Sequence, residues 1–193
     1  MTFRLYFLLS LFWCASAVAD AFQPVHPLTL WYDKPATAQQ SDNIWMKYSL
    51  PIGNGQLGAC LFGGVGCDEI QFNEKTLWTG GPSDMGEDGF YRNFGSVLVE
   101  DLDGGTDSKA ADYVRYLDLE EAVGGVDYRL NGYSYSRRYL SSYPDGAIVV
   151  RYTTTNPSGL HLRISVQPGK ELGDPVVAYA GSDVHFSGKL TTV

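Results

Sequence analysis

The sequence predicts an all-β fold, an antiparallel β-sandwich, and three observations lead to this prediction. Asn131-Gly132 separates two alternating runs, and this dipeptide favours the tight turn of a β-hairpin. Residues 160–166 alternate between apolar and polar side chains, as in a strand with one face on a core and one in water. No stretch repeats its apolar residues with helical periodicity, so many short strands with frequent turns favour a sandwich.

The elements expected in the first half of the chain are short. Residues 33–56 are predicted to be irregular, apart from a brief helix around Trp45. Gly63-Gly64-Val65-Gly66 lies between two apolar runs and predicts a hairpin, whereas the glycine-rich, polar residues 79–89 predict a loop. Strands are expected over residues 28–32, 57–62, 69–72 and 96–102.

The second half contains clearer signals. Pro144-Asp145-Gly146 predicts a turn, because proline fixes φ and glycine accepts a positive φ. No closing element follows the last strand signal before Val193, so we expect a sandwich that is incomplete at this end and leaves an unpaired edge. Strands are expected over residues 126–130, 133–140, 147–153, 160–166, 176–179 and 184–186.

The N-terminus has the pattern of a secretory signal peptide over residues 1–21. Arg4 precedes an uncharged run from Leu5 to Trp13, and small residues follow up to Ala21. The apolar run is short for a membrane-spanning helix, which needs roughly 20 residues. We therefore expect cleavage, secretion or periplasmic export, no membrane insertion afterwards, and a β-sandwich domain over residues 22–193.

Charge and composition restrict the partners of this domain. The formal net charge is -8, which argues against nucleic acid and anionic membranes, because binding phosphate requires clustered Lys and Arg. Aromatic residues make up 13% of the chain, which argues against disorder. A neutral partner such as a sugar fits this composition.

Carboxylates offer the first candidates for chemistry. Hydrolysis of a glycosidic bond usually needs two carboxyl groups across a pocket. Spacing along strands does not select a pair, and we favour the interpretation that all candidates are solvated strand ends and turn caps. The candidates are Asp68, Glu69, Glu74, Asp101, Asp103, Glu120 and Glu121.

Cys60 and Cys67 remain after signal cleavage, and two interpretations stay open for them. Export permits a disulfide between the neighbouring strands of the predicted hairpin, but the spacing does not fix the register. Alternatively, both are small buried hydrophobic residues. The three histidines are scattered, with no cysteine or carboxylate at metal-ligand spacing, so no metal site is expected.

Three tryptophans lie near predicted loops or strand ends and could bind the apolar face of a sugar: Trp31, Trp45 and Trp78. A buried position in the core is the alternative for each. Trp78 directly precedes Thr79-Gly80-Gly81-Pro82, which makes it the most interesting of the three.

Several blocks, in this order, resemble the N-terminal domain of the family 95 glycoside hydrolases, the α-L-fucosidases. The pair Ile-Gly-Asn-Gly and Asn-Glu-x-Thr-Leu-Trp at this separation is specific. The blocks are LWYDKPA at 30–36, LPIGNGQLGACLFGGV at 50–65, IQFNEKTLWTGGP at 70–82, DYVRYLDLEEAVGGVDY at 112–128 and YSYSRRYLSSYPDGAIVVRY at 133–152.

The resemblance implies a large β-sandwich that precedes a helical barrel, and in this family the barrel contains the catalytic groups. It implies inverting removal of α-linked L-fucose from fucosylated glycans, without metal or organic cofactor. We therefore expect no catalytic residue in this chain and an intramolecular contact with a barrel. The residues expected to contact substrate or that barrel are Asn54, Asn73, Glu74 and Trp78.

A second hypothesis is a free-standing carbohydrate-binding sandwich. Its binding surface would be Trp78 or the tyrosine-rich hairpin at Tyr133–Tyr139. Asn73 and Glu74 also have a purely structural interpretation, in which they satisfy backbone groups of a loop.

Overall fold

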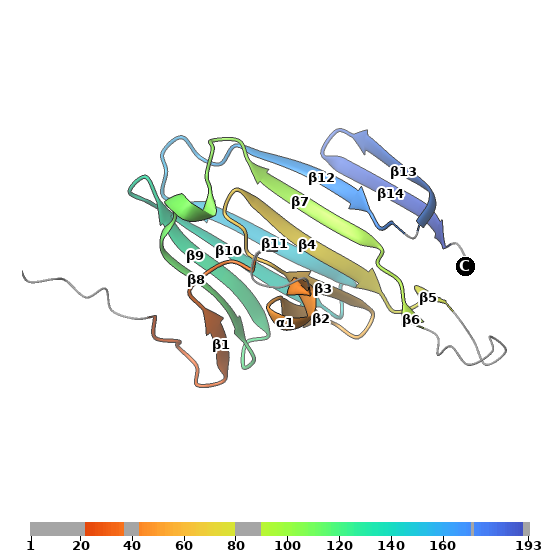
Figure 1. Ribbon diagram of the computed structural model, residues 1–193, viewed down its shortest axis with the longest axis horizontal. Coiled ribbons are helices and arrows are strands. Elements are labelled where there is room, and N and C mark those ends of the chain that lie inside the picture. The colour runs from red at the N-terminus through yellow and green to blue at the C-terminus, as the bar shows by residue number, and fades with distance from the viewer. Residues whose placement is uncertain (1–21, 37–42, 80–89, 171, 191–193) are drawn as a thin grey trace, which may run out of the picture.

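The computed structural model describes residues 22–36, 43–79, 90–170 and 172–190. The predicted signal peptide and most of the predicted loop at 79–89 lie outside these residues. Two antiparallel sheets of five strands each form two layers, which confirms the predicted all-β sandwich (Figure 1). No helix among the described residues is long and apolar enough to cross a membrane.

Sheet A has the strand order β1-β8-β9-β10-β11. Its strands are β1 (Thr29–Tyr32), β8 (Ala111–Asp118), β9 (Val123–Leu130), β10 (Tyr133–Ser142) and β11 (Ala147–Thr154). Asn131 and Gly132 join β9 to β10 with φ angles of 52° and 84°, the two positive values of the predicted hairpin turn.

Sheet B has the strand order β12-β7-β4-β3-β2. Its strands are β2 (Leu50–Gly53), β3 (Leu57–Leu61), β4 (Cys67–Glu74), β7 (Gly95–Asp101) and β12 (Leu162–Pro168). The predicted hairpin around Gly63–Gly66 is the β3–β4 connection. The chain therefore alternates between the sheets. β1 belongs to sheet A, the strands β2, β3, β4 and β7 to sheet B, β8 to β11 to sheet A, and β12 again to sheet B.

Smaller elements lie around the two sheets. The helix expected near Trp45 is present as α1, and two short hairpins extend beyond sheet B, with β13 and β14 next to β12 (Figure 1). These elements are α1 (Ile44–Lys47), β5 (Trp78–Thr79), β6 (Phe90–Tyr91), a 3-10 turn (Asp107–Lys109), β13 (Leu172–Ala180) and β14 (Asp183–Leu190).

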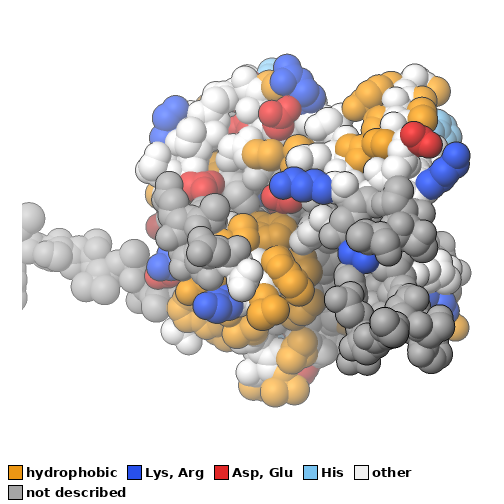
Figure 2. All heavy atoms as spheres, turned by 45° about the vertical axis from the view of Figure 1, so that its right-hand side comes forward, with side chains coloured by type: hydrophobic (Ala, Val, Ile, Leu, Met, Phe, Trp, Pro, Cys, Tyr) orange, Lys and Arg blue, Asp and Glu red, His pale blue; other side chains and the backbone are white. Residues whose placement is uncertain are grey.

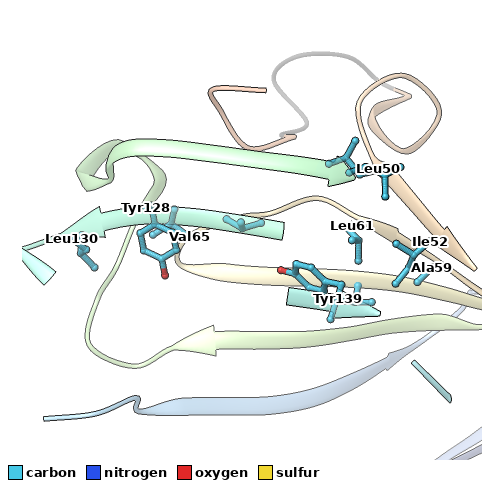
Figure 3. Packing of buried hydrophobic residues seen from close by; sticks show 11 residues of the cluster. Leu50, Ile52, Ala59, Leu61, Val65, Tyr128, Leu130 and Tyr139 are labelled. Carbon is cyan, nitrogen blue, oxygen red and sulfur yellow. The ribbon is translucent and has the colours of Figure 1, made fainter. Parts of the chain in front are cut away.

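The core lies between the sheets, where apolar residues from both layers meet (Figure 3). Leu50, Leu61 and Val65 come from the side of sheet B, and Val126 and Tyr139 from sheet A; all five are almost fully buried. A side chain at Gly124 would come within 2.6 Å of Leu61, so the two layers meet closely at this point.

Two strands of the five-stranded sheets, β2 and β8, were not predicted, and each has a physical reason. The prediction of an irregular segment at residues 33–56 is wrong for β2, whose Pro51 and Gly53 are poor strand formers. Proline is tolerated there because β2 is the edge strand of sheet B. In β8 the charged Arg115 interrupts the apolar pattern, although its side chain is buried.

The prediction for residues 160–166 is only partly right. Ile164 pairs with Val99, so both side chains lie on the inner face of sheet B. Val99 is buried, but Ile164 is 54% exposed. Sheet A therefore does not cover Ile164 on β12.

The cysteines form no disulfide, and both are free. Cys60 pairs with Gln71 in the β3–β4 register, whereas Cys67 lies at the far end of β4 opposite Glu100. Cys67 is exposed and Cys60 is half-buried, so the alternative of two buried hydrophobic residues is also wrong. Partial burial, with nearby carboxylates, raises the pKa of the Cys67 thiol.

Candidate functional site

An open groove lies on the outer face of sheet B, where β2, β3 and β4 form its floor. Pro51, Cys60 and Gln71 are cross-strand neighbours in one row, and Gly58 and Asn73 are neighbours in the next. Side chains alternate along a strand, and Ala59 and Ile70 are in the core, so these two rows face outward. We call this the outer-face groove.

Side chains from α1 and the segment around β6 form the walls of the groove: Trp45, Tyr91, Arg92 and Asn93. Its main part has a volume of about 580 Å³. Figure 2, turned so that the side of β5 and β6 comes forward, shows hydrophobic side chains gathered on this face.

A second hollow of about 240 Å³ continues the groove past Asn73 and Tyr91, which line both parts. The β2–β3 turn borders this hollow through Gly55 and Gln56. Asn54 holds that turn, because its Oδ1 accepts hydrogen bonds from the N–H groups of Gln56 at 3.0 Å and Leu57 at 2.7 Å. Its Nδ2 donates to the carbonyl of Ser142 at 2.7 Å, which ties sheet B to β10.

Asn73 and Glu74 both line the groove, and both stabilise the end of β4. Asn73 Oδ1 accepts a hydrogen bond from the N–H of Glu74 at 2.8 Å. Glu74 accepts from the hydroxyl of Thr76 and from its N–H, the latter at 2.9 Å. These contacts agree with the structural interpretation of the pair and place it at the groove.

The chemistry of Glu74 differs from that of a general acid. Hydrogen bonds from the Thr76 side chain and backbone lower the pKa of Glu74, whereas a glycosidase acid needs a raised pKa. Glu74 is the single carboxylate among the described residues that line the groove. A catalytic pair across the groove is therefore absent from the described lining.

Trp78 lies beside the groove and supports one of its walls. Its ring packs edge-on against Tyr91, with ring centroids 5.0 Å apart at 86°. Trp78 is 48% exposed, and Trp31 and Trp45 are also exposed, so the alternative of buried tryptophans is wrong for all three. The structure thus gathers Asn73, Glu74 and Trp78 around one groove, with Asn54 at its border.

Two of the other candidate carboxylates, Asp68 and Asp101, are held by structural hydrogen bonds. Asp68 is fully buried, so its assignment as a solvated strand end is wrong. It accepts hydrogen bonds from Tyr139 and Tyr152, each at 2.7 Å, and lies 3.5 Å from Arg137. Asp101 accepts from the N–H groups of Asp103 and Gly105, so its assignment as a turn cap is confirmed.

The tyrosine-rich hairpin does not form an exposed aromatic surface. Tyr139 is fully buried, and Tyr135 is half-buried with its ring stacked 5.2 Å from Tyr128. Tyr133 alone of the predicted tyrosines is exposed. This hairpin therefore lacks the exposed aromatic surface through which the second hypothesis predicted sugar binding.

Sequence reasoning missed most of the groove: Gly58, Gln71, Tyr91 and Asn93. Gly58 and Gln71 belong to adjacent strands, and only the register reveals that they share an outer face. Tyr91 and Asn93 follow the predicted loop, and no periodicity in the sequence indicates that they return to β4. One sequence feature could have indicated the groove: Gly58 is a glycine inside an apolar strand.

Comparison with known proteins establishes the family. The family model described as "Glycosyl hydrolase family 65, N-terminal domain" matches residues 30–89 and 83–192. The chain belongs to this family. "Alpha-L-fucosidase 2" of Arabidopsis thaliana is 31% identical over 150 residues, which cover 61% of this chain and 18% of that protein.

A second relative, "Probable alpha-fucosidase A" of Aspergillus niger (strain ATCC MYA-4892 / CBS 513.88 / FGSC A1513), is 25% identical over 201 residues. The match covers 86% of this chain and 25% of the relative. The predicted resemblance to the N-terminal domain of family 95 fucosidases, which have this domain type, is confirmed. The chain spans a quarter or less of the length of these relatives.

Proposed function

We propose that this chain is the non-catalytic N-terminal domain of an exported glycoside hydrolase that removes α-linked L-fucose from glycans. The outer-face groove supports the proposal, because aromatic and amide side chains line it and Glu74, the one carboxylate among its described lining residues, has a lowered pKa. Both relatives described above are named as fucosidases, which supports the choice of sugar.

In this proposal the catalytic groups belong to a helical barrel outside residues 22–193, and the groove end of sheet B faces that barrel. Asn54 and Asn73 fix the turns that border the groove. Trp78 fixes the Tyr91 ring on its wall. Asn54, Asn73, Glu74 and Trp78 would then act by positioning a surface that the barrel and its substrate contact.

A fucose-release assay tests the proposal. Incubated alone with 2′-fucosyllactose, the chain releases no L-fucose above the blank. Inserted in place of the matching segment of the Arabidopsis relative, it supports release, and Glu74→Gln in that hybrid retains release because Glu74 is not the acid. Fucose release by the chain alone that disappears in Glu74→Gln would contradict the proposal.

Export is part of the proposal and is supported by the signal pattern over residues 1–21. Cleavage after Ala19 or Ala21 leaves Asp20 or Phe22 as the first residue. Phe22 packs against Trp31 and Tyr116, with ring centroids 5.6 Å and 5.8 Å apart, so a mature chain that starts nearby is anchored on sheet A. N-terminal sequencing of protein recovered outside the cytoplasm tests this; an intact Met1 in that protein would contradict it.

A further inference from the structure

We propose that the outer-face groove is a binding subsite for a neutral sugar unit of the glycan, other than the fucose that is removed. The inference rests on the proposed function and assigns this domain a direct contact with substrate. The ligand class follows from four properties of the groove: its aromatic walls, its amide groups, its charge and its glycine floor.

The walls expose aromatic rings that the fold does not bury. Trp45 is 52% exposed on α1, a helix with no buried residue, and Tyr91 is 57% exposed. The edge-on contact with Trp78 holds the Tyr91 ring in place. Exposed aromatic side chains grouped around one hollow mark a binding surface, and a rigid ring can pack against the C–H face of a pyranose.

Amide groups supply the polar contacts that hydroxyl groups need. Gln71 and Asn73 lie on the floor in adjacent rows, and Asn93 lies on the wall. The Oδ1 of Asn93 is buried and accepts no hydrogen bond from the part of the chain that the structure describes. An unpaired buried acceptor is costly, so a hydrogen-bond donor that reaches it from the groove would be favoured.

The charge of the groove favours a neutral ligand. Arg92 is the one charged residue among the described residues of the main hollow, and it already interacts within the protein. Glu74 and Lys75 line the second hollow together, with opposite charges. The described lining of the groove therefore holds no cluster of one sign that would attract an anion or a cation.

Gly58 leaves the floor of the groove open without a structural need for glycine. A Cβ atom at Gly58 would meet only the Ile52 carbonyl oxygen, at an ordinary 3.7 Å, and its φ does not require glycine. The missing side chain instead deepens the groove, because position 58 faces outward and lines both hollows. A volume of about 580 Å³ falls within the range typical of small-molecule sites.

Calorimetric titration of the exported chain tests the proposal with three probes: lactose, 2′-fucosyllactose and L-fucose. Lactose and 2′-fucosyllactose are expected to bind with similar affinity, roughly millimolar, and L-fucose at least about tenfold more weakly. Absence of lactose binding would overturn the proposal. This holds regardless of whether another domain covers the groove in the whole protein. Tighter binding of L-fucose than of lactose would also overturn it.

Two variants and a matched control locate the binding. Gly58→Val fills the floor, and Trp45→Ala removes a wall; each should weaken lactose binding at least about tenfold. Trp31→Ala removes an exposed tryptophan from the edge of sheet A and should leave binding unchanged. Unchanged binding in Gly58→Val, with a native melting temperature, would overturn the proposal. Binding is measured without hydrolysis, so its failure is distinguishable from failure of the fucose-release assay.

Discussion

Asp68, Arg115 and Arg137 are charged side chains that the core encloses, and each joins segments that are distant in the sequence. Arg115 donates hydrogen bonds to the carbonyls of Lys34 at 2.8 Å and Tyr48 at 2.6 Å. Arg137 donates to the carbonyls of the Gly64-Val65 turn and faces Asp68 across the two sheets. Burial alone would lower the pKa of Arg137, but Asp68 and the surrounding tyrosines raise it, so the guanidinium stays charged.

Asp68→Asn is predicted to be strongly destabilising. The substitution removes the negative charge that faces Arg137 and leaves a buried cation without its partner, which costs about 3 kcal/mol. Urea unfolding measures the loss. Asp103→Asn is the matched control: its hydrogen bond with His161 is exposed, and the substitution should change stability by less than about 1 kcal/mol. Equal effects of the two substitutions would contradict the prediction.

His26 and Asp118 form a second residue-scale feature that responds to pH. His26 Nδ1 lies 2.5 Å from Asp118 Oδ2, a hydrogen bond that raises the pKa of His26 and lowers that of Asp118. Their carboxylate neighbours Glu120 and Glu121 raise the pKa of His26 further. The pair attaches the N-terminal segment to the end of β8.

The sign of each pKa shift gives the pH window of this attachment. The contribution of His26 is complete below about pH 6.5 and is lost as pH rises through its raised pKa. The contribution of Asp118 is present above about pH 3.8 and is lost as pH falls through its lowered pKa. NMR titration should therefore give His26 a pKa above 6.5, and Asp118→Asn should return it towards that value. An unchanged His26 pKa in Asp118→Asn would contradict the assigned cause.

At the scale of elements, turns were more predictable than strands. Asn131-Gly132 and Pro144-Asp145-Gly146 identified β9, β10 and β11, because turn chemistry is local and legible in a few residues. In contrast, β8 was missed because its Arg115 breaks the apolar pattern. Nothing local shows that the arginine is satisfied by carbonyls in the segment before β2.

Gly132→Ala tests how much the β9–β10 turn depends on glycine. The φ of Gly132 is 84°, and no atom lies within 4 Å of an added Cβ, so the cost is backbone strain alone, about 1 kcal/mol. Denaturant unfolding measures it. Gly58→Ala, where φ is not positive, is the control and should be neutral or slightly stabilising. An unchanged free energy of unfolding in Gly132→Ala would contradict the prediction, because the turn would then have changed type at no cost.

At the scale of the molecule, two surfaces of the sandwich differ: the outer face of sheet B carries the groove, and the edge strands β11 and β12 lie on an open side. The groove on sheet B could not be derived from the sequence. It depends on the register of β2, β3 and β4, and on the chain after β6 bringing Asn93 back beside β4. The open side lies along β11 and β12, each at the edge of its sheet. There Ile164, on the inner face of sheet B, is 54% exposed.

Ile164→Lys is predicted to reduce self-association of the chain. Unpaired edges with exposed apolar side chains promote edge-to-edge pairing, and a lysine at the edge opposes it. Sedimentation velocity over a concentration series should show less oligomer for Ile164→Lys than for the native chain, with unchanged unfolding stability. A matched substitution on the outer face, Ser165→Lys, is the control, and an equal decrease there would contradict a role for the inner face.

The alternation of the chain between the two sheets also determines when the molecule can form. β1 pairs with β8, and β7 with β12, so neither sheet can be completed before distant strands have been synthesised. Pairing between distant segments is slow, which delays the closure of both layers. A nascent chain of this topology can form the local β2–β3–β4 hairpins early but cannot close either layer, and this delay agrees with the export proposed above.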